Sequence, residues 1–293
     1  MKKTIEFNTS TNDMSAQLTR GKSSTYEDLV LVEGYRKYRH RFEPGKTKIR
    51  LLPALMGGGN WMLQIPTLQN QNGRHADPRT VQVGVRSVFD LAFSHMKEKC
   101  PTRLFSRANK TGIRLLPSPM SLCWAIVEDS NGIKLRLVLH SFYDGSRGGA
   151  NGLGNTIYNL VLQAGEKCNL PGHPLNPADG VSLIVERIGG SETKYPSYRV
   201  TLADDRGPLQ PILDRISEVE HNMLCPVEEI IHILKPEDEW RLLAKVVGDD
   251  LAAEIRAAQE SGNTDEECGT SSNVEEGAIA DDDYTDFPKK WEI

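Results

Sequence analysis

The stretch LCWAIVEDSNGIKLRLVL, residues 122–139, is typical of a β-hairpin. Two apolar runs flank the pair Asn131-Gly132, and Asn-Gly favours the positive φ angles of a type I′ turn. In the second run, apolar residues alternate with Lys134 and Arg136, which places the apolar and basic side chains on opposite faces of a strand. The alternation in the first run leaves two alternatives for Trp124: it packs in the core, or it is presented to a ligand.

Similar short apolar runs, separated by Gly, Pro and Asn, continue on both sides of this hairpin and are typical of a strand-rich domain. We expect further strands at residues 48–52, 61–65, 81–85, 181–188 and 195–202, with the last two joined as a hairpin at Gly189-Gly190. Helical periodicity interrupts the strands at 86–98 and 153–164. The sequence therefore predicts a mixed, β-dominated fold with inserted helices.

Composition and hydrophobic pattern divide the chain into four parts. Residues 1–29 are polar and predict a flexible arm, and residues 30–205 hold the expected strands. Helical patterns at 211–222, 226–234, 236–247 and 249–260 predict a helical segment over residues 206–260, with Pro226 and Pro236 as first-turn prolines. Residues 261–293 have little apolar content and predict a disordered acidic tail.

Charge is segregated along the chain. The whole chain carries a net charge of -5, whereas residues 261–293 contain ten acidic residues against Lys289 and Lys290, a net charge of -8. Residues 1–260 therefore carry +3. A basic body with an acidic tail favours a nucleic-acid partner.

The densest positive charge lies in YRKYRHRFEPGKTKIRLLP, residues 35–53. It combines seven basic residues with three aromatic rings, a mixture that suits a polyanion carrying flat bases. The alternative is a solvated, charged strand with its aromatic residues packed inward. On the first interpretation the contacts are Tyr35, Arg36, Lys37, Tyr38, Arg39, Arg41, Phe42, Lys46, Lys48 and Arg50.

Several classes of protein are disfavoured by what the sequence lacks. It has no phosphate-binding GxxxxGK[ST] loop, no HExxH, no GxSxG and no CxxC, so we expect that it is not an enzyme. His75, His95 and Cys100 could be imagined as zinc ligands, but a structural site usually needs four well-spaced Cys or His, so we expect no metal and no cofactor. The absence of an 18-residue apolar run, an apolar signal-peptide stretch and paired cysteines predicts a cytoplasmic protein without membrane contact.

A basic and aromatic sheet face favours single strands, because a duplex binder more often places a basic helix in the major groove. Lys134 and Arg136 belong to such a face, and Tyr195 and Arg199 lie together on one face of the strand at 195–202. None of the predicted helices is strongly basic on one side. The sequence thus predicts a strand-based interface for single-stranded nucleic acid.

The ordered motifs resemble the gene 32 type single-stranded-DNA-binding proteins of tailed bacteriophages. The motifs are KIRLLP (48–53), Cys100-Pro101, CWAIVED with its hairpin strand (123–139), VSLIVERIGG (181–190), YPSYRV (195–200) and the acidic tail. The resemblance implies an OB-fold-like barrel, an N-terminal arm for cooperative self-association, and a tail that recruits replication and recombination proteins. The family binds zinc through one His and three Cys, but Cys100-Pro101-Thr102-Arg103 lacks the second cysteine of its CxxC.

Individual residues acquire roles from this resemblance. Trp124 resembles the family's aromatic-Trp-Ala strand, and Tyr195 resembles its late DNA-facing tyrosine. The segment RGKSST resembles the family's basic Ser/Thr arm motif, interrupted here by Gly21, and implies self-association through Arg20, Lys22, Ser23, Ser24 and Thr25. The ending resembles acidic tails with aromatic ends, and its partner-binding residues are expected to be Tyr284, Phe287 and Trp291.

The sequence therefore predicts a protein that coats and protects single-stranded DNA during phage or mobile-element replication, recombination and repair, in the host cytoplasm if of phage origin. Two alternatives stay open. One is an RNA-binding module on a similar barrel, which would differ by contacts to the 2′-hydroxyl. The other is a phage assembly or scaffolding protein that uses the basic stretch as a protein interface.

Overall fold

The computed structural model describes residues 27–55, 59–70, 73–80, 87–105, 112–129, 132–143, 152–189 and 197–263. Several sequence-based predictions lie outside these ranges. They are the strand at 81–85, Tyr195, the self-association residues Arg20, Lys22, Ser23, Ser24 and Thr25, and the tail residues Tyr284, Phe287 and Trp291.

The predicted hairpin at 122–139 is confirmed. Strand β5 (Ser118–Asp129) pairs with β6 (Gly132–Ser141) in antiparallel register from Met120↔Ser141 to Asp129↔Gly132. Gly132 has a φ of 103°, a left-handed conformation that glycine adopts without the steric cost that a side chain would impose. The turn chemistry in the sequence was therefore sufficient to identify this hairpin.

The second edge of β5 is divided between two other strands. Its first half pairs with β3 (Met62–Asn70) and its second half with β2 (Gly45–Leu51), both antiparallel. The change of partner falls at Trp124, whose carbonyl accepts a hydrogen bond from the Leu52 amide at 3.1 Å. Strand β5 therefore contacts three strands and holds the sheet together.

The remaining strands extend this sheet in both directions. Strand β4 (Gly73–Ala76) pairs with β3, and the short β1 (Glu27–Asp28) adds to β4 as the one parallel pair among the strands described. On the other side β7 (Gly180–Ile188) pairs with β2, and β8 (Ser197–Gly207) pairs with β7, as expected from the sequence. The order is β1-β4-β3-β5-β2-β7-β8, with β6 beside β5, and within the described chain no ladder joins β8 to β6. The sheet is therefore open.

Both faces of β5 are buried, so the sheet contributes to two cores. We call the first the strap-side core; on it lie Leu122, Trp124 and Ile126 of β5 and Leu135, Leu137 and Leu139 of β6. Trp124 thus adopts the core alternative. The helix-side core lies on the opposite face, where α4 (Leu153–Gln163), a helix close to its predicted bounds, packs against β5 through Leu153, Ile157 and Val161.

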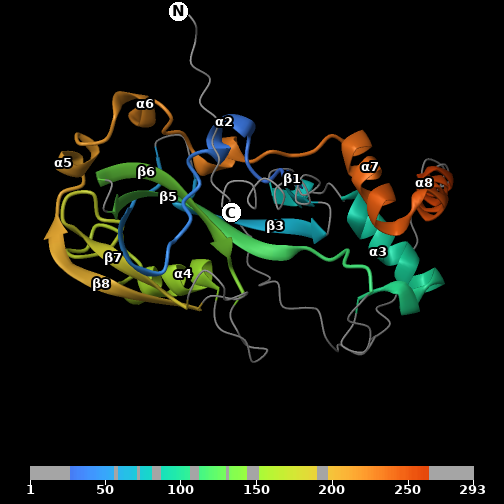
Figure 1. Cartoon of the computed structure of the whole chain (residues 1–293), viewed down its shortest axis with the longest axis horizontal. Helices are drawn as coiled ribbons and strands as arrows, with labels where there is room; N and C mark the ends of the chain where they lie inside the picture. The colour runs from blue at the N-terminus through green and yellow to red at the C-terminus, as the bar shows by residue number, and fades with distance from the viewer. Residues whose placement is uncertain are drawn as a thin grey trace, which may run out of the picture. The chain divides into compact units, whose positions relative to one another are not determined.

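A third core joins two helices to the far end of β3. Helix α3 (Val88–Lys99) and helix α7 (Pro236–Val247) lie side by side (Figure 1), and Phe89, Met96 and Leu243 are buried with Leu68 of β3. Helix α8 (Asp249–Asn263) follows α7. Both C-terminal helices agree with the sequence, and no helix in the described ranges is long and apolar enough to cross a membrane.

The predicted helices at 211–222 and 226–234 are largely wrong. This region has only the single turns α5 (Gln210–Leu213) and α6 (Glu218–His221) and a 3₁₀ turn at Val227–Ile230, followed by isolated bridges from Ile231 to Leu31 and from Ile233 to Ala76. We call residues 209–231 the strap. Its apolar residues, including Leu209, Ile216, Val227 and Ile230, are buried in the strap-side core. Tertiary packing on the sheet therefore outweighs helical periodicity here.

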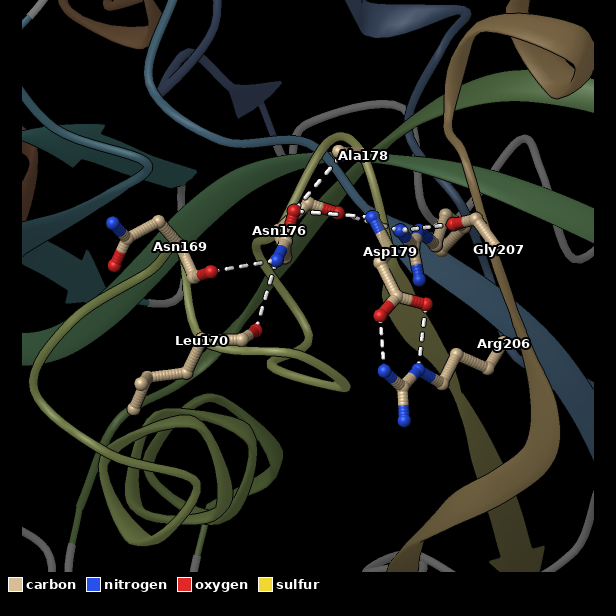
Figure 2. Close-up of polar contacts among 8 residues, drawn as sticks. Asn169, Leu170, Asn176, Ala178, Asp179, Arg206 and Gly207 are labelled. Atoms are coloured by element: carbon tan, nitrogen blue, oxygen red, sulfur yellow. Dashed lines mark hydrogen bonds and ion pairs between the residues drawn. The ribbon is translucent and has the colours of Figure 1, made fainter.

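A polar network clamps the loop between α4 and β7 (Figure 2). Asn176 donates from Nδ2 to the carbonyls of Asn169 and Leu170, and its Oδ1 accepts from the amides of Ala178 and Asp179. Arg206 of β8 forms a two-pronged ion pair with Asp179. Arg50 Nη2 donates to the carbonyls of Asn176 at 2.8 Å and Gly207 at 3.2 Å. These contacts tie the loop to both β2 and β8.

Gly180 leaves room for this clamp, which yields a test of stability. A Cβ at residue 180 would overlap the Arg50 guanidinium and the Asn176 carbonyl, whereas a Cβ at Gly207 would meet nothing within 4 Å. We expect Gly180→Ala to lower the free energy of unfolding by about 1–3 kcal/mol, the usual cost of overpacking. Gly207→Ala is the matched control and should unfold near the wild-type midpoint in urea. Equal midpoints for the two variants would contradict the clamp.

A buried polar pair connects β4 to α7. His75 is fully buried and Glu239 is 3% exposed, with His75 Nε2 3.9 Å from Glu239 Oε1. Glu239 Oε2 accepts a hydrogen bond from the Val88 amide at the start of α3. Burial lowers the pKa of His75 to about 4. Burial also raises the pKa of Glu239 to about 7, with Asp77 and Asp90 adding to the rise.

These shifts make the contribution of Glu239 to stability depend on pH. Because its folded-state pKa is raised, this contribution is full below pH 4.5 and is lost as pH rises through about 7. His75 acts in the opposite direction, with its contribution full above pH 6.5 and lost towards pH 4. The contributions of all other titratable groups, His75 included, are common to wild type and Glu239→Gln and cancel in the difference between their melting temperatures. We therefore expect the melting temperature of Glu239→Gln to rise relative to that of wild type between pH 4.5 and 7. A difference that does not vary with pH would be the opposing result.

Candidate nucleic-acid interface

Four residues predicted at the interface have side chains in the protein interior. Tyr38 and Trp124 lie in the strap-side core and Phe42 in the helix-side core, with 5%, 2% and 4% exposure. A ring without an exposed face cannot stack on a base. Arg50 is 4% exposed, and burial lowers its pKa. Its guanidinium serves the loop clamp, so the structure corrects its predicted role from phosphate contact to internal bracing.

Arg136 and Tyr35, two further predicted residues, help to hold the strap against the sheet. Arg136 Nη1 lies 2.7 Å from Glu220 Oε1, where α6 lies beside β6 (Figure 1). Trp124 Nε1 donates to the Cys225 carbonyl at 2.9 Å, and the Cys225 thiol donates to the Tyr35 hydroxyl at 3.2 Å. The Tyr35 ring lies edge-on to Trp124, with centroids 6.2 Å apart. The strap therefore covers the apolar face of β5 and β6.

Three predicted residues meet in a groove of about 750 Å³ across β2, β7 and β8. Cross-strand pairing explains their proximity: Lys46 lies opposite Glu186, which lies opposite Arg199. In the next row, Glu128, Lys48, Ile184 and Thr201 follow one another across four strands. The groove is lined by Lys46, Lys48, Glu128, Ile184, Glu186, Arg199, Thr201, Leu202, Ala203 and Asp204.

Most cations of this groove already face carboxylates. Lys48 Nζ lies 2.9 Å from Asp205 and 3.1 Å from Glu128, and its hydrogen bond to Asp205 is the main cause of its raised pKa. Arg199 Nη1 lies 3.7 Å from Glu186 Oε2. Lys46 is exposed and has no ion-pair partner among the residues described. The groove lining thus carries as many carboxylates as cations and offers a polyanion no net excess of positive charge.

The other exposed cations of the basic stretch lie along the outer edge of β6. The His40 amide donates to the Leu137 carbonyl and the Leu137 amide donates to the Tyr38 carbonyl, both at 2.8 Å. Arg36, Lys37 and Arg41 are exposed, while Arg39 and Lys134 are partly exposed. This edge therefore gathers positive charge outside the groove.

The acids of the groove were not predicted as site residues, and neither were Arg187 on β7 and Tyr198 on β8. Glu128, Glu186 and Asp204 were visible in the sequence, but their partners depend on strand register. In particular, Glu186 faces Lys46 on one side and Arg199 on the other only because β7 lies between β2 and β8. No local sequence signal reports that arrangement.

The possible zinc ligands have separate settings. His95 Nε2 lies 3.1 Å from Glu254 Oε1, Cys100 caps the C-terminus of α3, and His75 is buried beside Glu239. In the part of the chain that the structure describes, no three His, Cys, Asp or Glu side chains are grouped so that they could bind a metal ion.

No protein-family model matches this chain, and a search of curated proteins gave no match. Its function therefore has to be inferred from its own residues and their arrangement.

The matched charges of the groove can be tested by removing one sign at a time. If a polyanion lies in the groove, Glu186→Gln should tighten binding to oligo(dT), because Arg199 loses its carboxylate partner. Lys46→Gln should weaken binding. An exposed ion pair is worth about 0.2–1 kcal/mol, so each change should be about 1.5- to 5-fold in fluorescence titrations. If both variants bound like wild type, the groove would not be part of the interface.

Proposed function

We propose that this protein binds single-stranded DNA on an OB-like barrel, in the manner of the gene 32 type proteins, and that it is not an enzyme. The supporting observation is the strand order. Taken along the chain, β2, β5, β6, β7 and β8 are five strands arranged as β6-β5-β2-β7-β8, with α4 between the third and fourth. An OB fold is a five-stranded, partly open Greek-key barrel, and the open sheet is compatible with that description.

The strap limits which surface of such a barrel is available to DNA. In OB folds, oligonucleotides bind on the face of the second and third strands and on adjoining loops. Here these strands are β5 and β6, and the strap covers much of their outer apolar face. The exposed cations at 36–41 instead run along the edge of β6 that does not pair with β5. The proposed contact surface is therefore this edge, together with the groove.

The two chain ends complete the proposal. The arm residues around Arg20 would support self-association on DNA. The tail, with its net charge of -8, would compete with DNA for the body's cations and recruit partner enzymes through its aromatic residues. The competition follows from tethering, which supplies the acids at roughly millimolar effective concentration.

The proposal predicts strongly salt-dependent binding to oligo(dT). If about three to five phosphates are neutralised, the logarithm of the association constant should fall with the logarithm of salt concentration with a slope of about -2 to -3.5. The measurement is fluorescence anisotropy of labelled oligo(dT) between low and moderate salt.

Two controls accompany this titration. Arg241→Gln removes an exposed cation of α7 that pairs with Asp238, and it should leave the slope unchanged. A matched oligo(U) tests the RNA alternative, which would be favoured by tighter binding to RNA than to DNA. Absence of binding to both oligomers would reject the proposal and favour the scaffolding alternative.

A further inference from the structure

The open side of the sheet is a seam between β6 and β8. The two strands share no ladder in the described chain, yet His140 Nε2 of β6 lies 3.1 Å from the Tyr198 hydroxyl of β8, with ring centroids 4.7 Å apart. The Phe42 ring packs edge-on against Tyr198 at 6.1 Å. We define the seam by Arg41, Phe42, His140, Tyr143, Arg187 and Tyr198.

Positive charge gathers at this seam. Burial is the main cause that lowers the pKa of His140 to about 4, and Arg39, Arg74 and Arg187 lower it further. The imidazole is therefore neutral at pH 7, and the positive charge belongs to the arginines around it. Arg41, beside Phe42, is exposed.

Arg187 has a hydrogen-bonding capacity that the described chain does not use. Its Nη1 donates to the Phe42 carbonyl at 2.8 Å, but its Nε is buried and has no acceptor among the residues described. A buried N–H without an acceptor is costly, and a bound anion or water is the usual explanation. A guanidinium also matches the geometry of a phosphate.

An aromatic surface lies close to this guanidinium. Arg187 is directly opposite Tyr198 in the β7–β8 ladder. Burial raises the pKa of Tyr198, Arg187 opposes the rise and Tyr143 adds to it, so both side chains lie within electrostatic reach of Tyr198. Tyr143, just beyond the end of β6, is 50% exposed. A ring this exposed can stack on a base without rearrangement of the core.

We propose that the seam binds one phosphate and the adjoining base of a single-stranded nucleic acid, with Arg187 and Arg41 contacting the phosphate and Tyr143 stacking on the base. This inference rests on the proposed function and locates its site. His140 and Tyr198 are positioning residues, because their mutual contact fixes the spacing between the edges of β6 and β8, along which the nucleic acid would lie.

The first experiment measures oligo(dT) affinity and its salt dependence. Tyr143→Ala should weaken binding by about 5- to 150-fold, the range for loss of one stacked base. Tyr143→Phe keeps the ring and should bind like wild type. Arg41→Gln and Arg187→Gln should each reduce the steepness of the salt slope by about 0.7, the contribution of one phosphate contact. Thermal melting identifies any loss of folding in Arg187→Gln, and Arg41 is exposed, so its variant tests the phosphate contact independently.

The second experiment locates the strand directly. An oligo(dT) carrying 5-iodouracil is photocrosslinked to the full chain, and the attached peptide is identified by mass spectrometry. A crosslink at Tyr143 or Tyr198 is the expected result. Suppose that the wild-type chain binds oligo(dT), that the seam variants bind it equally well, and that crosslinks form only at β2 and the groove. The seam proposal would then be wrong, and the proposed function would still stand. No binding by the wild-type chain would overturn both.

Discussion

The sheet depends on one strand with three partners. Strand β5 gives one edge to β6 and divides the other between β3 and β2, so the part of the sheet with β2, β7 and β8 and the part that carries α3 and α7 meet along it. Both of its faces are buried, one under the strap and one under α4. A strand buried on both faces tolerates little change in side-chain volume, because closely packed interiors relax only partially. The continuous apolar run around Trp124 reflects this constraint.

The elements that were predictable from sequence are those whose ends carry residues, such as glycine or proline, that favour a turn or a helix terminus. The β5–β6 turn has Gly132 in the left-handed region, and α7 has Pro236 in its first turn and Gly248 with a φ of 96° at its end. The strap carried a comparable signal at Pro226, but only a 3₁₀ turn follows it, because the helical periodicity there arises from apolar residues that pack on a sheet. Burial of Tyr38 and Phe42 was one of two alternatives at the sequence level, and the choice between them depends on which distant elements cover the two rings.

The candidate site shows that the sequence also does not reveal which charges are available to a ligand. The basic stretch identifies where cations are dense, but their availability depends on partners from other elements. Arg50 braces a loop, Arg136 holds the strap, and Lys48 faces two carboxylates. Arg187, which is distant in sequence from that stretch, lies close to it only through strand pairing, which places it opposite Gly45 with Nη1 bonded to the Phe42 carbonyl. Charge counted along a chain and charge presented to a ligand are therefore different quantities.

The strap has a consequence for the order in which this chain folds during its synthesis. The β5–β6 hairpin is complete at Ser141, but the residues that cover its apolar face continue to Ile231, roughly 90 residues later. At about 5–20 residues per second, that face has no strap for roughly 5–20 s of translation. The nascent chain thus presents Leu135, Leu137 and Trp124 before their covering segment exists. An apolar hairpin left uncovered for this time is a target for chaperones and for pairing with another nascent chain.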